Sequence, residues 1–113
     1  MREPVVPAEA GTQSGQHHFE TALVYMLASQ KNGTIYIGVT SDLVKRVWQH
    51  KSDLVAGFTK EYQVHTLVWY EAHETMESAI VREKNIKAWK RLWKLELIEI
   101  SNLDWNDLYD QIV

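Results

Sequence analysis

Apolar and polar residues alternate along residues 34–40 (TIYIGVT), a pattern that predicts a strand with one apolar face. Its aliphatic residues point to one side, and Tyr36 and Gly38 point to the other. The apolar run ALVYMLA at 22–28 predicts a second strand, and the Asn-Gly turn within 29–33 joins the two into a β-hairpin. Strand packing does not explain a tyrosine beside a bare glycine on the face away from the aliphatic residues.

Helical periodicity and one further alternating run predict the rest of the domain. We expect Thr40 or Ser41 to cap a helix that ends at about Lys51, and a loop at Gly57 to lead into a strand at 65–71 (HTLVWYE). Two more helices follow, one of about 14 residues from Thr75 or Met76 and one from Arg91 to Ile100. Three strands interleaved with helices predict an α/β (α+β) sandwich with a small antiparallel or mixed sheet.

Length and composition predict one domain. A chain of 113 residues, 45% of them hydrophobic, buries about two thirds of its unfolded surface. We expect three segments, a flexible N-terminal arm at 1–20, a domain at 21–103 and an acidic C-terminal tail at 104–113. The arm is rich in Pro, Gly, Ser and Gln, and we interpret its His17–His18 pair as incidental. Trp105 and Leu108 could dock the tail.

Several classes of protein are excluded or disfavoured by composition. The chain has no cysteine, which excludes a disulfide framework and thiolate metal ligands. No apolar run approaches the roughly 20 residues that span a bilayer, and the N-terminal residues do not resemble a secretory signal. We therefore expect a soluble, cytoplasmic protein.

Charge is distributed unevenly along the chain. The formal net charge of −3 argues against a general polyanion binder. From Thr21 to Leu95, however, eleven Lys or Arg face seven Asp or Glu, a net +4, whereas the other positions carry one against eight, a net −7. The segment 81–94 (VREKNIKAWKRLWK) holds six basic residues and two tryptophans. It suits either a helix that binds nucleic-acid phosphates, through Lys87 and Lys90, or a solvated helix face with two core tryptophans.

Charged residues interrupt the apolar faces of two predicted helices. The apolar face of the first helix is expected to comprise Leu43, Val44, Val47 and Trp48, and that of the second Met76, Ala79, Ile80 and Ile86. Arg46 and His50, four residues apart, edge the first face. Glu83 projects within the second. A carboxylate there is either part of an ion pair with Arg46 or a neighbouring lysine, or part of a functional site, because an unpaired buried charge is costly.

Five positions in a fixed order resemble the GIY-YIG endonuclease superfamily. The sequence reads VYM at 24–26 and YIG at 36–38, followed by Arg46, His50 and Glu83. The likeness covers about residues 21–103 and is strongest to small stand-alone bacterial members, which are similar to the nuclease domain of the excinuclease C subunit. It implies a three-stranded antiparallel sheet flanked by helices, and hydrolysis of phosphodiester bonds in DNA with one divalent metal ion, in repair or recombination.

The resemblance also assigns roles to individual residues. Tyr36 would help to deprotonate the attacking water, while Gly38 leaves space beside it for the scissile phosphate. Tyr25, the tyrosine of the first motif half, would line the same site, Arg46 would hold the phosphate and His50 would orient Tyr36 or relay protons with it. Glu83 would bind Mg²⁺ or Mn²⁺, hard cations that suit a carboxylate combined with water and phosphate oxygens. The five side chains should therefore converge on one concave surface.

Two departures from the family pattern leave a second function open. The first motif half reads Val-Tyr-Met instead of Gly-Ile-Tyr, and Leu95 stands where many members have an asparagine, with Asn102 further along. The alternative is a domain of the same fold that binds nucleic acid or a partner protein without cleavage. The set of five residues favours the enzyme, since a binding module needs no inward carboxylate, whereas the acidic net charge and the missing asparagine favour the module.

Overall fold

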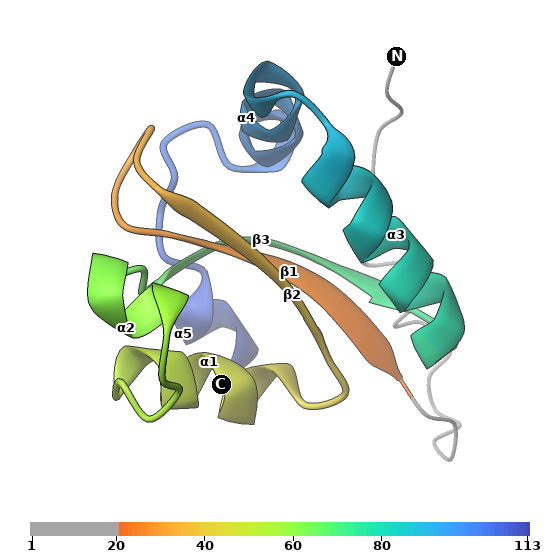
Figure 1. Cartoon of the computed structure of the whole chain (residues 1–113), viewed down its shortest axis with the longest axis horizontal. Helices are drawn as coiled ribbons and strands as arrows, with labels where there is room; N and C mark the ends of the chain where they lie inside the picture. The colour runs from red at the N-terminus through yellow and green to blue at the C-terminus, as the bar shows by residue number, and fades with distance from the viewer. Residues whose placement is uncertain (1–20) are drawn as a thin grey trace.

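A three-stranded antiparallel sheet separates two layers of helices in the computed structural model (Figure 1). The model describes residues 21–113, so the predicted N-terminal arm and its histidine pair lie outside the described residues. The strands are β1 (Ala22–Ala28), β2 (Ile35–Thr40) and β3 (Thr66–His73), in the sheet order β2-β1-β3. The predicted sandwich with a small antiparallel sheet is confirmed, and β2 is an edge strand.

Each face of the sheet has its own core. Helices α3 (Met76–Ala88) and α4 (Arg91–Ser101) cover one face, where Val24 and Met26 of β1 lie among the buried residues. On the opposite face, Tyr25 and Leu27 pack among residues of the remaining helices, which are α1 (Leu43–Lys51), α2 (Phe58–Tyr62) and α5 (Tyr109–Ile112). The alternation of side chains along β1 therefore feeds both cores. No helix within 21–113 combines the length and the apolar composition of a membrane span.

The β1–β2 hairpin fixes which residues lie opposite one another. Its turn is closed by backbone hydrogen bonds, among them Ser29 N–H to Thr34 O at 3.0 Å. The register pairs Tyr25 with Gly38, and Leu27 with Tyr36. Because paired residues of neighbouring strands share a face, both tyrosines project into the layer of α1 and α2.

The loop region after β2 differs from the sequence prediction in two respects. Neither Thr40 nor Ser41 is the N-cap of α1, because Asp42 caps it, with its Oδ1 accepting from Lys45 N–H at 3.1 Å. The segment predicted as a loop at Gly57 contains α2, which begins immediately after that glycine. Gly57 has φ 102°, in the region that favours glycine, so the residue marks a sharp entry into α2.

The predicted apolar faces of two helices are narrower than expected. Val44 and Trp48 of α1 are 37% and 50% exposed, and Ile80 of α3 is 38% exposed. Leu43 and Val47 do contact the core, as do Ala79 and Ile86 of α3. Short helices on a three-stranded sheet present only about one side chain per turn to it, which leaves the flanking apolar positions in solvent.

The acidic tail docks on both layers of the domain. Trp105 is buried in the α3–α4 core and Leu108 packs against the other core, as predicted. Leu108 N–H donates to Leu67 O at 2.8 Å, so the tail also binds the backbone of β3. Asn102 is also buried. Its amide donates to Val68 O at 3.1 Å, and its oxygen accepts from Asn106 N–H at 3.0 Å. The side chain of Asn102 therefore stabilises the tail.

Candidate active site at the edge of the sheet

Tyr25, His50 and Thr59 form a buried chain of hydrogen bonds that links β1, α1 and α2. The Tyr25 hydroxyl lies 3.0 Å from His50 Nε2, and His50 Nδ1 lies 2.9 Å from the Thr59 hydroxyl. None of the three is more than 1% exposed. His50 was expected at the edge of the α1 apolar face and is instead inside the core, because hydrogen bonds satisfy both ring nitrogens, with one donating and the other accepting.

Tyr36 stands beside this chain on the edge strand. Its ring centroid is 5.3 Å from that of His50 and 6.2 Å from that of Tyr25. Unlike Tyr25, Tyr36 is only partly buried, so its ring has contact with both the core and the solvent. This arrangement answers the question that the strand pattern raised, because Tyr36 belongs to a polar aromatic cluster on the face away from Ile37.

Gly38 provides the space for that cluster. A Cβ on Gly38 would lie 2.6 Å from the Tyr25 hydroxyl and 2.6 Å from the adjoining ring carbon, closer than any side chain tolerates. The phenol of Tyr25 therefore occupies the space that a side chain at position 38 would need, while the phosphate contact expected at Gly38 stays a prediction. The pairing of Tyr25 with Gly38 across the hairpin requires the glycine.

Arg46 supplies the positive charge beside the cluster. It lies one turn before His50 on α1 and donates to Gln49 Oε1 at 3.3 Å. Burial raises the pKa of Tyr25 to about 12, with Tyr36 adding to the rise and Arg46 opposing it. Burial, assisted by the charge of Arg46, lowers the pKa of His50 to about 4. At neutral pH the cluster therefore holds a protonated Tyr25 and a neutral His50.

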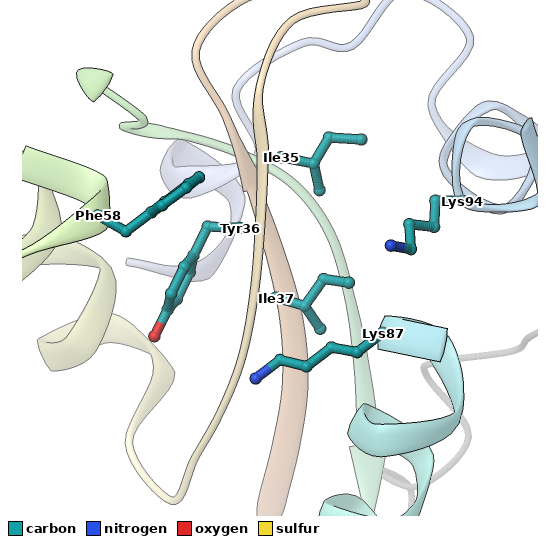
Figure 2. A pocket seen from close by; sticks show the side chains of 6 residues that line it. All are labelled: Ile35, Tyr36, Ile37, Phe58, Lys87 and Lys94. Atoms are coloured by element: carbon teal, nitrogen blue, oxygen red, sulfur yellow. The ribbon is translucent and has the colours of Figure 1, made fainter. Parts of the chain in front are cut away.

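A hollow of about 320 Å³ crosses the edge strand next to Tyr36 (Figure 2). Tyr36 and Phe58 line it on the side of α1 and α2, and Ile35 and Ile37 of β2 form part of its floor. Two lysines from the other helical layer complete it, Lys87 of α3 and Lys94 of α4. The hollow therefore joins residues from both layers around the free edge of β2.

Glu83 is linked to this hollow by an ion pair with Lys87, which lines it. The two residues are one turn apart on α3 and form an ion pair, with Glu83 Oε2 2.8 Å from Lys87 Nζ. Of the two partners that the sequence offered for a structural ion pair, the structure contains the neighbouring lysine and not Arg46. Tyr25, Tyr36 and His50 gather on the α1–α2 face of the sheet, where Tyr25 and His50 are buried, whereas Glu83 lies on α3, which covers the opposite face (Figure 1). The five side chains therefore do not share the single concave surface that was predicted.

The remaining basic residues of the segment 81–94 divide between two surfaces. Lys94 lines the hollow, whereas Lys90 precedes α4 and lies over the ring of Trp93, 5.2 Å from its centroid. Trp89 is half-buried against the core, but Trp93 is 39% exposed, so only one of the two tryptophans behaves as a core residue. Phosphate binding by Lys87 and Lys90 stays a prediction, and of these two residues Lys87 lines the hollow, together with Lys94.

Comparison with known families agrees with this geometry. A model of the "GIY-YIG catalytic domain" matches residues 21–96, which include both motif tyrosines, Arg46, His50 and Glu83. The chain belongs to the GIY-YIG family. The resemblance inferred from the sequence is confirmed, and the three-stranded antiparallel sheet with flanking helices is consistent with the GIY-YIG α/β fold.

Relatives of the GIY-YIG domain are small proteins of similar size. A UPF0213 protein of Staphylococcus saprophyticus is 37% identical over 68 residues, which are 60% of this chain and 83% of the relative. A UPF0213 protein of Staphylococcus aureus has the same identity and coverage. The solution structure of a UPF0213 protein from Bacillus halodurans is 28% identical, covers 77% of this chain and 92% of its own, and superimposes with a TM-score of 0.49.

The donor set of this GIY-YIG domain suits only a loosely held divalent cation. Within residues 21–113, no group of three or more His, Cys, Asp or Glu side chains is arranged to hold a metal ion. Glu83 contributes one carboxylate, and its ion-pair partner Lys87 lines the hollow. One carboxylate is compatible with Mg²⁺ or Mn²⁺, which retain several waters and commonly take the other ligands from a substrate phosphate.

Three residues of the candidate site were not predicted from the sequence. Thr59 and Phe58 lie on α2, whose five residues are too few to show a helical period. In the sequence, Lys94 was considered only as one of the six basic residues in the segment 81–94. Gly57, immediately before Phe58, was the signal in the sequence that the chain turns sharply there.

The low pKa of His50 predicts acid sensitivity of the fold. A histidine with pKa about 4 when folded and about 6.5 when unfolded contributes its full stability above pH 6.5. As the pH falls from 6.5 to 4, the unfolded chain binds a proton that the folded chain does not, which costs up to about 1.4 kcal/mol per pH unit. We expect the melting temperature to fall over this window and to fall less in His50→Gln. Parallel pH profiles of the two proteins would contradict the assignment.

Proposed function

We propose that the protein is an endonuclease that hydrolyses phosphodiester bonds in DNA with the help of one divalent metal ion, Mg²⁺ or Mn²⁺. The observation that carries the proposal is the cluster of Tyr25, Tyr36, Arg46 and His50 at the edge of the sheet, next to a hollow with two lysines. Membership of the GIY-YIG nuclease superfamily supports it. A cleavage step in repair or recombination is the setting that the family resemblance suggests.

The two tyrosines have different tasks in this proposal. Tyr25 is buried and its pKa is about 12, so it stays protonated and serves to position His50 and Arg46. Tyr36 is the phenol that reaches solvent at the hollow, so it is the one that contacts the attacking water. General base assistance of this kind contributes roughly 10²- to 10⁴-fold to a rate.

His50 supports the aromatic cluster, and Arg46 acts at the phosphate. His50 is buried and neutral at pH 7, and its pKa of about 4 makes it a weak proton acceptor, so it orients the cluster through its hydrogen bonds to Tyr25 and Thr59. Arg46 binds the phosphate and offsets the negative charge that develops as the water attacks. Lys87 and Lys94 hold the flanking phosphates across β2, where the hollow opens.

Glu83 is the residue that would hold the metal ion. When bound, the cation polarises the phosphate and lowers the pKa of a bound water. Lys87 Nζ lies 2.8 Å from Glu83 Oε2, so the ammonium group competes with the cation for the carboxylate. This competition makes metal binding depend on substrate, because a DNA phosphate draws the Lys87 ammonium away and brings oxygen ligands with it.

The Glu83–Lys87 ion pair also favours one alternative function. With its carboxylate neutralised by lysine, the domain would bind nucleic acid through the cations of the hollow without cleaving it. The two functions differ in their response to metal. A pure binding module keeps its affinity after chelation and leaves the DNA intact.

A cleavage assay on labelled DNA separates enzyme from module. The assay would test single-stranded, duplex, flapped and branched substrates together. We expect at least one of them to be cut in Mg²⁺ or Mn²⁺ and left intact in EDTA. Restoring the metal in excess over the chelator should restore cleavage. Binding to every substrate with no cleavage of any, in either metal, would establish the module instead.

A further inference from the structure

Three aromatic side chains form a row that runs outward from the candidate site. Tyr36 stacks on Phe58 with ring centroids 6.2 Å apart and planes 30° apart, and Phe58 contacts Tyr62 at 4.8 Å. We call these three residues the aromatic row. Phe58 is 43% exposed and Tyr62 is 51% exposed, so two of the three rings are accessible to solvent.

Core packing does not account for the outer part of the row. Thr59 is the buried residue of α2, and its hydroxyl contacts His50. The same five-residue helix therefore inserts a polar group into the site and carries Phe58, which lines the hollow, and Tyr62, whose ring contacts Phe58. A contiguous exposed aromatic surface, unlike a single exposed ring, is typical of a binding site.

Lysines lie across the edge strand from the row. The hollow that Tyr36 and Phe58 line on one side of β2 is lined by Lys87 and Lys94 on the other (Figure 2). A ligand seated there meets ring faces on one side and two ammonium groups on the other. This combination fits a nucleic-acid strand, whose bases have flat π-faces and whose phosphates are anionic.

We propose that the aromatic row stacks the unpaired bases of single-stranded DNA, so that the substrate is single-stranded where it crosses β2. The proposal rests on the proposed function, because it assigns a substrate class to the same site. In a duplex the base faces are already stacked on one another and only their edges are accessible in the grooves, so exposed rings gain little from it. An unpaired strand can place its bases on the row and its phosphates on the two lysines.

The stacking site can be tested by binding without any cleavage. Fluorescence anisotropy in EDTA would compare a labelled oligo-dT, an abasic strand of the same length and a duplex. We expect oligo-dT to bind most tightly. Phe58→Ala and Tyr62→Ala should each weaken its binding roughly 5- to 100-fold, since one base–aromatic stack is worth about 1–3 kcal/mol, and should leave abasic-strand binding nearly unchanged.

Matched variants separate stacking from folding. Tyr62→Phe keeps the ring and should bind oligo-dT as the wild type does. Trp48→Ala removes a ring of equal exposure, 50% against 51%, that lies outside the aromatic row, and it should also bind normally. Lys94→Gln should lower the magnitude of the salt slope for oligo-dT by about 0.7, the value for one phosphate contact on a single strand. Thermal melting of each variant confirms that it is folded.

The outcomes distinguish this proposal from the proposed function. Tighter binding of duplex than of oligo-dT, or equal losses on oligo-dT and the abasic strand, would overturn the stacking site even if the wild type cleaves duplex DNA. Tighter binding of oligo-rU than of oligo-dT would overturn the assignment to DNA. Binding of oligo-dT that depends on Phe58, with no cleavage in any metal, would support the stacking site and refute the endonuclease.

Discussion

Replacing Tyr36 with phenylalanine should lower the rate of DNA cleavage by about 10²- to 10⁴-fold, the contribution of general acid–base assistance. The ring stays where it is, between His50 at 5.3 Å and Phe58 at 6.2 Å, and only the hydroxyl at the hollow is lost. A lost hydrogen bond costs about 0.5–1.5 kcal/mol, so the protein should remain folded. Single-turnover cleavage and thermal melting measure the two effects.

Tyr70→Phe is the matched control for that variant. Tyr70 is a partly buried tyrosine that packs in the same core, but it lies on β3, on the opposite side of β1 from Tyr36. The same loss of a hydroxyl there should leave cleavage within about twofold, because Tyr70 pairs with Tyr25 from the β3 side and does not line the hollow. A Tyr36→Phe enzyme that cleaves as fast as Tyr70→Phe would remove Tyr36 from the mechanism.

Replacing Glu83 with glutamine should lower metal-dependent cleavage by at least about 10²-fold while leaving DNA binding in EDTA intact. An amide has nearly the same shape but lacks the charge that binds a hard cation, and even an outer-shell partner of a metal ligand is worth roughly 10- to 100-fold. The effect on the melting temperature should be small. Lys87 is 54% exposed, and a pair of this kind four residues apart on a helix contributes only about 0.3–0.5 kcal/mol.

Lys87→Gln breaks the same ion pair from the other side. It should weaken DNA binding and reduce its salt dependence, and it should shift the Mg²⁺ dependence of cleavage to lower concentration, because the ammonium no longer competes for the carboxylate. Opposite shifts in the two variants would identify Glu83 as the metal ligand. Loss of cleavage in both variants, accompanied by a large fall in melting temperature, would instead show that the pair is structural.

The pKa values explain why one family motif contains two tyrosines with unequal burial. A phenol with pKa about 12 is a poor base at neutral pH, so Tyr25 cannot share the task proposed for Tyr36. Tyr25 instead holds one ring nitrogen of His50 by a hydrogen bond, and Thr59 orients the same ring through the other nitrogen. The cluster is thus a preorganised support with a single phenol, that of Tyr36, left accessible at the hollow.

Local sequence determined the strands, the hairpin and most helix boundaries. Alternation along β2 identified the face of Tyr36, and the Asn-Gly turn required a two-stranded unit with fixed register. The helices at Met76–Ala88 and Arg91–Ser101 begin within about one residue of their predicted starts. The first of them is capped by the Thr75 side chain, which is a local signal. The order of the five motif residues was also readable, since spacing along the chain needs no structure.

Only the tertiary structure decided which residues share the site. Gly38 makes room for Tyr25 because the hairpin register places them opposite one another, a contact between positions thirteen residues apart in the sequence. Thr59 and Phe58 reach the cluster because α2 packs beside α1, although five residues carry no period to read. The sequence left Glu83 either in an ion pair or in a functional site, and the partner in its ion pair, Lys87, could be identified only from side-chain geometry on α3. Backbone propensities act over a few residues, whereas the site joins strands and helices from both layers at the free edge of β2, and that juxtaposition is a property of the packed domain.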